Sequence, residues 1–186
     1  MKNNPILVAI DTKDLGKAKT LCRSLVGVVG GVKLGLEFIF ANGIKGVNEI
    51  AELGMPIFLD TKFYDIPNTV SGAVSSVIRS MNNVFMLNVH CLGGLEMMQR
   101  AAESINEASI KYNKEKPLLI GVSILTSMDM FEMNEVGIDG LVQDEVLKLA
   151  QLAKEAGLDG LVCSPLEVYM LKEELGMPIF LDTKFY

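Results

Sequence analysis

Short apolar segments alternate with amphipathic segments six times along this chain of 186 residues. An unbroken apolar run of about four to eight residues is typical of a strand buried on both faces, whereas apolar residues spaced three and four apart are typical of a helix that covers a sheet. Six alternations therefore predict a parallel sheet with helices packed on its outside. The predicted strands cover residues 6–10, 32–35, 57–62, 84–90, 118–124 and 160–163, and the predicted helices cover residues 15–25, 46–53, 68–81, 95–112, 141–156 and 166–175.

Two architectures place a parallel sheet inside a layer of helices: an open doubly wound sheet and a (β/α) barrel. The open sheet usually carries a glycine-rich phosphate turn after its first strand, but residues 11–14 read Asp-Thr-Lys-Asp, without a G-x-G-x-x-G pattern. A barrel instead gathers functional groups at the carboxyl ends of several strands. The barrel is favoured because polar residues occupy those positions in this sequence. They are Asp11, Lys33, Asp60, Lys62, His90 and Thr126.

The third predicted strand ends in an alternating run of charges. Asp60 and Lys62 are two residues apart, so in an extended strand they point to the same side of the sheet. Buried charges are costly unless they compensate each other, and a simple ion pair that closes the top of a barrel would meet that requirement. Asp65 in the following loop and Lys33 on the neighbouring strand extend the pair to two acids and two bases. Such a network perturbs pKa values and favours a catalytic site over a purely structural ion pair.

The charge balance and the cysteine and histidine content argue against several classes of function. The net charge is −6 and the pI is about 4.9, which argues against a general nucleic-acid binder. His90 is the single histidine, and the three cysteines lack the C-x-x-C spacing of zinc or redox sites, so we expect no metal and three reduced, mostly buried thiols. No signal peptide and no apolar run of ~20 residues are present, so we expect a cytoplasmic protein without membrane contact.

A ten-residue segment after the third predicted strand carries the most specific motif. Residues 60–69 read Asp-Thr-Lys-Phe-Tyr-Asp-Ile-Pro-Asn-Thr and closely resemble the D-x-K-F-x-D-I-P-N-T signature of orotidine 5′-phosphate decarboxylases. A bare D-x-K-x-x-D pattern is shared with sugar-phosphate enzymes of the same superfamily, such as hexulose-phosphate synthases, and the continuation Ile66-Pro67-Asn68-Thr69 distinguishes this chain from them. Further segments resemble the family in the same order, between about residues 5 and 175. They are residues 9–11, 32–35, 88–90 and 125–128.

The resemblance implies an enzyme that needs no cofactor and converts orotidine 5′-phosphate to UMP and CO₂ in pyrimidine biosynthesis. In this family CO₂ leaves from C6 of the orotate ring, and the poorly delocalised carbanion that remains must be stabilised and protonated. Lys62 is implied as the cation beside C6 and as the proton donor. Asp60 is implied near the departing carboxylate, while Lys33 and Asp65 would keep Lys62 charged and oriented.

Further residues are implied in substrate binding. Asp11 and Lys33 would hydrogen-bond the ribose hydroxyls, and Thr126 would contact the pyrimidine. Three residues of the loop after the third strand would reach into a partner subunit's site, which implies a homodimer with two shared active sites. These three are Asp65, Ile66 and Thr69.

Two other features have simpler interpretations. His90 ends a strand, and we interpret it as a structural hydrogen-bonding residue rather than a catalytic base. Residues 128–133 are rich in methionine, which packs adaptably, and we interpret them as a loop or short helix that covers the top of the barrel.

Residues 174–186 repeat residues 52–64 letter for letter. Nothing around either copy matches, so the repeat resembles a gene-assembly event that put the third strand's segment in the place of a seventh strand. We therefore expect residues 1–186 to form a single, incomplete TIM-barrel domain of the (β/α)8 family, with about six strand–helix units and a possible seventh strand. Asp182 and Lys184 are not expected to form a second site, because the copy stops before any equivalent of Asp65.

The missing end leaves alternatives open. In the family, the last two strand–helix units carry the glutamine, the arginine and the backbone amides that grip the 5′-phosphate. A chain without them would be either a decarboxylase with a weakened site or a non-catalytic barrel fragment whose open strand edges favour aggregation. A sugar-phosphate enzyme of the same superfamily is a further alternative.

Overall fold

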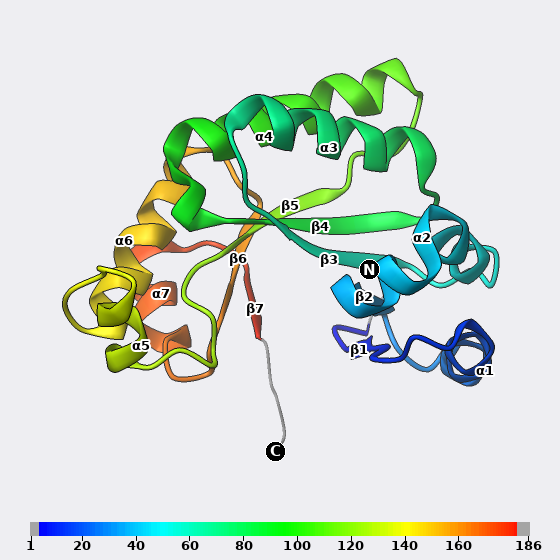
Figure 1. Ribbon diagram of the computed structural model, residues 1–186, viewed down its shortest axis with the longest axis horizontal. Helices are drawn as coiled ribbons and strands as arrows, with labels where there is room; N and C mark the ends of the chain where they lie inside the picture. Colours follow the sequence, from blue (N-terminus) through cyan, green and yellow to red (C-terminus); the bar gives the residue numbers. More distant parts are fainter. Residues whose placement is uncertain (1–3, 182–186) are drawn as a thin grey trace. The chain divides into compact units, whose positions relative to one another are not determined.

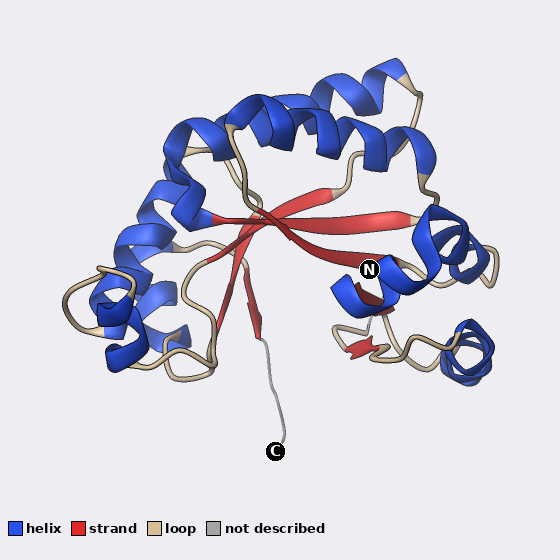
Figure 2. Cartoon of the chain, in the orientation of Figure 1, coloured by secondary structure: helices blue, strands red, loops and turns tan. Residues whose placement is uncertain are grey.

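The computed structural model describes residues 4–181. Strands and helices alternate along this part of the chain, as Figures 1 and 2 show. The strands are β1 (Leu7–Ala9), β2 (Gly31–Gly35), β3 (Ile57–Phe63), β4 (Val84–His90), β5 (Leu118–Val122), β6 (Gly160–Cys163) and β7 (Ile179–Leu181). The helices are α1 (Leu15–Leu25), α2 (Leu36–Ala51), α3 (Pro67–Ser80), α4 (Gly94–Lys111), α5 (Met130–Glu135), α6 (Val142–Glu155) and α7 (Val168–Leu175), with a short 3₁₀ helix η1 (Cys91–Gly93).

The described residues form two compact units. The first unit comprises residues 4–61, 72–87 and 105–117, and the second comprises residues 62–71, 88–104 and 118–181. The boundary runs through β3, β4, α3 and α4, so each of these elements contributes residues to both units.

In the first unit the strands hydrogen-bond in the order β1-β2-β3-β4. β1 and β2 pair in parallel with Val8 opposite Val32, and β2 and β3 pair in parallel with Val32 opposite Ile57. Val32, Leu34 and Ile57 are fully buried. Burial on both faces is the reason that parallel strands read as nearly continuous apolar runs.

Helices α1 and α2 belong to the same unit and contact each other. Asp14 caps α1, because its carboxylate accepts a hydrogen bond from the N–H of Lys17. The ammonium of Lys19 lies 2.8 Å from the carboxylate of Glu49 on α2, and both side chains are about one quarter exposed. This pair is screened by water and contributes only modestly to stability.

The second unit continues the sheet in the order β4-β5-β6-β7. β5 pairs in parallel with β6, with Ile120 opposite Gly160, and β6 pairs in parallel with β7, with Leu161 opposite Ile179. The carboxylate of Asp159 accepts a hydrogen bond of 2.8 Å from the N–H of Leu119, which fixes the start of β6 against β5. The possible seventh strand of the sequence analysis is therefore confirmed.

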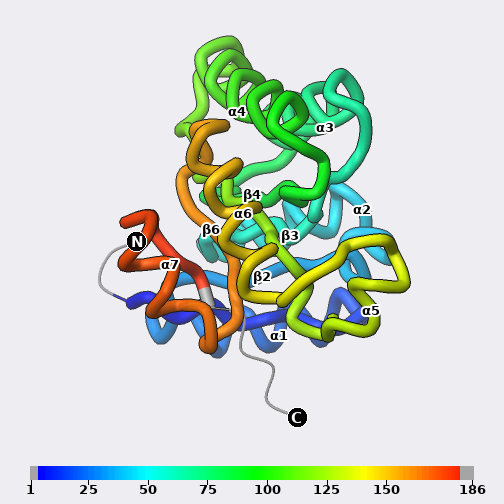
Figure 3. Tube along the Cα trace, turned by 90° about the vertical axis from the view of Figure 1, so that its left-hand side faces the viewer, coloured from blue at the N-terminus to red at the C-terminus, as the bar shows by residue number. Residues whose placement is uncertain are grey.

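Helices α3 and α4 lie side by side, as both Figure 1 and Figure 3 show. In the second unit the hydroxyl of Ser104 on α4 donates a hydrogen bond of 2.7 Å to the carbonyl of Ser71 on α3. In the first unit Lys114, just after α4, donates to the carbonyl of Met81 at 2.8 Å. A lysine at the end of a helix satisfies carbonyls that have no partner within the helix, so Lys114 stabilises the end of α3.

The strand order bears on the choice between the two predicted architectures. Within each unit the strands follow the sequence order, with no reversal. A doubly wound sheet reverses its order at a switch point, so the topology agrees with the predicted barrel family and not with the open sheet. None of the helices between residues 4 and 181 combines the length and hydropathy needed to span a bilayer.

Most predicted boundaries hold, and one helix is longer than expected. The observed bounds of α1, β4 and β6 are those predicted, whereas β1 is shorter than residues 6–10. The first half of α2 was not predicted, because Leu36, Phe40 and Ile44 are exposed and form no inward apolar stripe. Gly43, with φ of 61°, also interrupts this helix and obscures its periodicity.

The three cysteines are free and buried, as the sequence analysis expected. Burial raises the pKa of Cys22 to about 11 and the pKa values of Cys91 and Cys163 to about 12. All three side chains are therefore protonated thiols at neutral pH, which suits packing rather than nucleophilic chemistry.

Candidate active site

An ion pair between the adjacent strands β2 and β3 forms the centre of the candidate site in the first unit. The ammonium of Lys33 lies 3.1 Å from the carboxylate of Asp60. Asp60 is buried, with 6% of its surface exposed, whereas the side chain of Lys33 is one quarter exposed. A buried charge is costly unless an opposite charge compensates it, and Lys33 lies at ion-pair distance from Asp60. The sequence analysis placed both residues in one charge network without predicting this particular pair.

Asp11 lies at the end of the neighbouring strand in the same unit. The preceding residue, Ile10, is fully buried and donates its N–H to the carbonyl of Lys33 at 3.0 Å. Asp11 follows at once and is exposed. The first unit thus brings together Asp11, which follows β1, Lys33 on β2 and Asp60 on β3.

β3 continues from Asp60 through Thr61 to Lys62, the first residue of the second unit. Lys62 is half-buried, and its backbone φ is 47°, which lies outside the extended region. Its N–H donates a hydrogen bond of 2.7 Å to the side-chain oxygen of Asn88 on β4, a residue with 1% of its surface exposed. The regular strand that the sequence analysis assumed for the Asp60–Lys62 pair therefore changes conformation at Lys62.

His90 lies at the end of β4 in the second unit. Its Nδ1 accepts a hydrogen bond of 3.4 Å from the N–H of Leu92, and its ring centroid lies 5.7 Å from that of Tyr64. Burial, and secondly the positive charge of Lys62, lower the pKa of His90. A lowered pKa leaves the imidazole neutral at pH 7, in agreement with the structural, hydrogen-bonding role predicted for it.

The loop after β3 exposes the residues that the resemblance implies in partner contact. The carboxylate of Asp65 accepts a hydrogen bond of 2.7 Å from the N–H of Ile66, and the carbonyl of Ile66 accepts one of 3.0 Å from the N–H of Thr69. All three residues are exposed, and Ile66 has 67% of its surface in contact with solvent. These bonds give the loop a defined conformation just before α3.

Thr126 and the methionine-rich segment follow β5. Thr126 is exposed in the loop. The sequence analysis left a loop or a short helix open here, and the structure has a short helix, α5, which starts at a capping box in which Asp129 and Glu132 each bond the other's backbone. Met133 is fully buried, whereas Phe131 is largely exposed, so one face of α5 packs and the other is open to solvent.

Two residues near the strand ends were given no role by the sequence analysis. Asn88 lies within a segment that resembles the family, but nothing in its spacing indicates the contact with Lys62. Glu167, after β6, is buried and accepts a hydrogen bond of 2.7 Å from the N–H of Ser164. Burial raises the pKa of Glu167, and the bond from Ser164 partly opposes this rise. A single glutamate in a loop carries no sequence signal that would reveal its burial.

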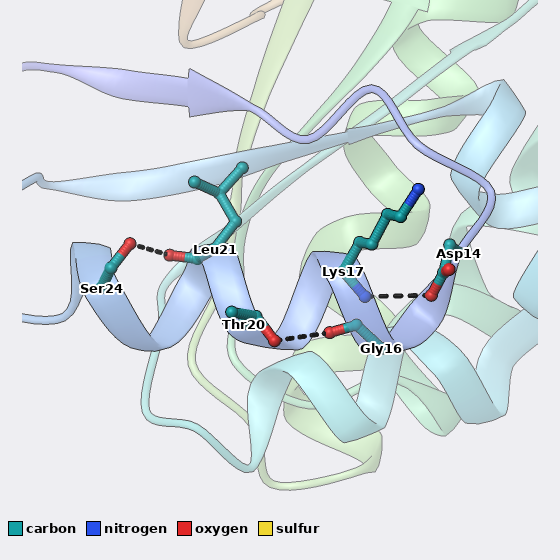
Figure 4. A pocket seen from close by; sticks show the side chains of 6 residues that line it. All are labelled: Asp14, Gly16, Lys17, Thr20, Leu21 and Ser24. Carbon is teal, nitrogen blue, oxygen red and sulfur yellow. Dashed lines mark hydrogen bonds between the residues drawn. The ribbon is translucent and has the colours of Figure 1, made fainter.

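Surface hollows do not coincide with these residues. A shallow hollow of about 610 Å³ lies along α1 (Figure 4). Its polar groups are satisfied within the helix: Asp14 accepts from the N–H of Lys17, and the hydroxyl of Thr20 donates to the carbonyl of Gly16. Another hollow, of about 310 Å³, is lined by residues 77–85 and 114–117, also in the first unit. No predicted site residue lines either one, so we assign no function to them.

Among the described residues, no three histidine, cysteine or acidic side chains are grouped as a metal site would require. The charged residues near the strand ends are therefore assigned to the candidate active site.

Comparison with known proteins identifies the family. Residues 4–184 match the model of the "Orotidine 5'-phosphate decarboxylase / HUMPS family". The orotidine 5′-phosphate decarboxylase of Rhodospirillum rubrum is 46% identical over 184 residues, which span 98% of this chain and 74% of the relative.

Two solved structures extend this similarity to the fold. An uncharacterised conserved protein from Geobacillus kaustophilus has a TM-score of 0.87 and 34% identity, over 95% of this chain and 82% of its own. Orotidine 5′-phosphate decarboxylase from Lactobacillus acidophilus has a TM-score of 0.80 and 31% identity, over 96% of this chain and 80% of its own. The chain therefore belongs to the orotidine 5′-phosphate decarboxylase family and to its TIM-barrel fold.

Proposed function

We propose that this protein decarboxylates orotidine 5′-phosphate to UMP and CO₂ in pyrimidine biosynthesis, without a metal or cofactor. The observation that carries the proposal is the 3.1 Å ion pair between Lys33 on β2 and Asp60 on β3, and Asp60 comes two residues before Lys62 in the sequence. It occurs within a family match that covers almost the whole chain.

In the proposed reaction, the bond between C6 and the carboxylate breaks, CO₂ leaves, and the electron pair remains on C6. Lys62 then transfers a proton from its ammonium to C6 and later regains one from water. Asp60, paired with Lys33, would lie near the departing carboxylate and disfavour its negative charge. Preorganised charges of this kind act on the transition state more than on the substrate.

Substrate binding is proposed to use residues on three strands. Asp11 and Lys33 would hydrogen-bond the ribose hydroxyls, which is supported by their positions at the carboxyl ends of adjacent strands. Thr126, exposed after β5, would contact the pyrimidine. His90 is not proposed as the proton donor, because its lowered pKa leaves it uncharged at neutral pH.

We further propose that the protein acts in the cytoplasm as a homodimer with shared active sites. Asp65, Ile66 and Thr69 would reach into the partner's site. The exposure of all three residues supports this proposal, and so does the exposure of an apolar side chain as large as Ile66.

Two alternative functions have less support. A sugar-phosphate enzyme would share the Asp60, Lys62 and Asp65 pattern but not the Ile66-Pro67-Asn68-Thr69 continuation. The relatives in Rhodospirillum rubrum and Ehrlichia chaffeensis, at 46% and 49% identity, are both orotidine 5′-phosphate decarboxylases. A non-catalytic protein would have no need for a charge pair around a buried carboxylate, which is costly to maintain.

The test is to incubate the purified chain with orotidine 5′-phosphate labelled in its carboxylate and to measure released CO₂. A parallel sample receives a hexulose phosphate, whose consumption is followed by mass spectrometry because this sugar carries no carboxylate to release as CO₂. Release from the nucleotide alone supports the proposal. Turnover of the sugar phosphate alone, or of neither compound, would overturn it.

A further inference from the structure

Lys62 has a backbone conformation that its side chain disfavours. Three non-glycine residues among positions 4–181 have positive φ: Lys62 at 47°, Asn83 at 56° and Asn113 at 50°. Asparagine tolerates this left-handed region because its short side chain bonds the nearby backbone, whereas lysine has no such compensation. The conformation at Lys62 therefore requires support from the surrounding structure, and strain of this kind concentrates at functional sites.

Asn88 makes the contact that can provide this support. Its side-chain oxygen accepts a hydrogen bond of 2.7 Å from the N–H of Lys62. Asn88 is buried, with 1% of its surface exposed, and it lies in the middle of the well-packed strand β4. A buried and rigidly held acceptor fixes the direction of the peptide N–H to which it is bonded.

The side chain of Lys62 depends on this backbone direction. When φ changes from the extended to the left-handed region, the Cα–Cβ bond of the residue turns relative to the strand. The bond from Asn88 that holds the peptide therefore also fixes the direction in which the Lys62 side chain leaves the backbone. A regular extended residue here would send the side chain in another direction.

We propose that Asn88 is the positioning residue that holds Lys62 in its left-handed conformation and so aims the Lys62 ammonium at the substrate. The second half of this statement rests on the proposed decarboxylase function. The first half concerns the fold alone and has a test of its own.

The first test is a double-mutant cycle on thermal unfolding, and it needs no activity. With Asn88 present, Lys62→Gly should unfold about 2–4 °C above Lys62→Ala, because glycine adopts positive φ without strain. With Asn88→Ala, the left-handed conformation is no longer imposed, and this advantage of glycine should vanish. An advantage that stays the same with and without Asn88 would overturn the proposal.

Two further variants of Asn88 serve as controls for this test. If Asn88→Ala does not fold, Asn88→Leu fills the same volume without an acceptor and should also abolish the advantage of glycine. Asn88→Asp keeps an acceptor oxygen in place and should preserve the advantage. Loss of the advantage in Asn88→Asp would show that the accepting oxygen is not the cause.

The second test measures turnover of orotidine 5′-phosphate. Asn88→Ala should lower kcat about 10²-fold with little change in KM, because a small displacement of a catalytic group costs about this factor. The matched control is Ser104→Ala, which also removes one buried side-chain bond to a backbone group of the second unit, 2.7 Å long, but far along the sequence from β3. It should lower the unfolding temperature while kcat stays near that of the unaltered chain.

The outcomes of the two tests are separable. A kcat for Asn88→Ala no lower than that for Ser104→Ala would make Asn88 structural only and would overturn the positioning role. Absence of turnover in the unaltered chain would contradict the proposed function, and the unfolding cycle would still decide whether Asn88 holds Lys62.

Discussion

Residues 52–59 and 174–181 have the same sequence and nearly the same backbone structure, but they lie in different surroundings. Each copy passes through a glycine of positive φ (Gly54 at 82°, Gly176 at 62°) and enters a strand at the isoleucine of the Pro-Ile-Phe-Leu run. Helix α2 ends at Ala51, just before the first copy, whereas α7 ends at Leu175, inside the second. Local sequence thus determines the left-handed glycine and the start of the strand in both places, whereas the helix before them ends at different positions.

The neighbouring strands receive the two copies in the same way. The N–H of Val32 bonds the carbonyl of Pro56 at 2.9 Å, and the N–H of Leu161 bonds the carbonyl of Pro178 at 3.1 Å. Glycine precedes both Val32 and Leu161. A Cβ added at Gly31 would lie 2.7 Å from the carbonyl oxygen of Pro56, and one added at Gly160 would lie 2.8 Å from the carbonyl oxygen of Pro178. Gly160 on β6 therefore makes room for the second copy in the same way as Gly31 on β2 makes room for the first.

The two copies differ in how deeply their side chains are buried. Ile57 is fully buried and Met55 is 2% exposed, whereas Ile179 and Met177 are only half-buried. β3 has hydrogen-bonded neighbours on both sides, and the neighbour of β7 in the described part is β6. The same side chains thus contribute different free energies, which shows that the sequence of a strand determines its conformation and its neighbours determine its stability.

The largest expected difference between the copies is catalytic. Lys62→Ala should reduce turnover of orotidine 5′-phosphate by about 10³-fold or more, because it removes the proposed proton donor and the cation beside C6. Lys184→Ala alters the equivalent residue of the second copy and should leave kcat within about twofold of that of the unaltered chain. Steady-state kinetics of both variants decides this, and an equal loss in both would contradict the assignment of a single site.

The next difference is in stability. Ile57→Ala should lower the free energy of unfolding by about 2–5 kcal/mol, since it opens a cavity in a fully buried position. Ile179→Ala removes the same atoms from a half-buried position and should cost about 1 kcal/mol. Denaturant titration of the two variants measures both values. Similar losses would mean that β7 is packed as tightly as β3.

A third difference concerns the residue on the neighbouring strand that lies opposite the phenylalanine of each copy. Lys33 lies opposite Phe58 in the register of β2 and β3, and the equivalent residue opposite Phe180 is Val162. Lys33→Val would give the first copy the neighbour of the second. It should cost about 1–3 kcal/mol, because the buried carboxylate of Asp60 loses its ion pair. Chemical unfolding at pH 7 provides the measurement, and an unchanged stability would show that Asp60 is compensated elsewhere.

The two glycines should behave alike. Gly54→Ala and Gly176→Ala each place a Cβ on a residue of positive φ and should each cost about 1 kcal/mol. Thermal unfolding of the pair checks this. A loss confined to one variant would show that positive φ does not by itself determine the cost at the two positions.

The smallest expected effect is a dependence on pH at the end of the first copy, where Tyr64 contacts His90. Because the pKa of His90 is lowered on folding, the unfolded chain binds more protons near pH 6, and stability should fall as the pH drops below the unfolded value of about 6.5. Above that value the contribution is fully present. His90→Gln should make stability depend less on pH in this range. An unchanged dependence in this variant would contradict the lowered pKa of His90.

The sequence predicts the order of elements and most of the site because both depend on local patterns. The apolar runs locate β4 and β6, and the motif at residues 60–69 locates Asp60 and Lys62. The pairing of Lys33 with Asp60 follows from adjacent strands in a parallel sheet.

The features that were missed depend on tertiary contacts. The left-handed backbone of Lys62 requires Asn88 from another strand, and no residue near Lys62 in the sequence signals it. The burial of Glu167 depends on how its loop folds back on Ser164. The first half of α2 has exposed apolar residues, so its helical conformation does not appear as a periodic stripe.

The most direct test of the central claim is the reaction in D₂O. The purified chain and its Lys62→Ala variant are incubated with orotidine 5′-phosphate, and the UMP and CO₂ are quantified by mass spectrometry. We expect the unaltered chain to yield equal amounts of CO₂ and UMP, with one deuterium at C6, and the variant to yield neither at a comparable rate. Equal product formation by both chains, or no UMP from the unaltered chain, would contradict decarboxylation through Lys62.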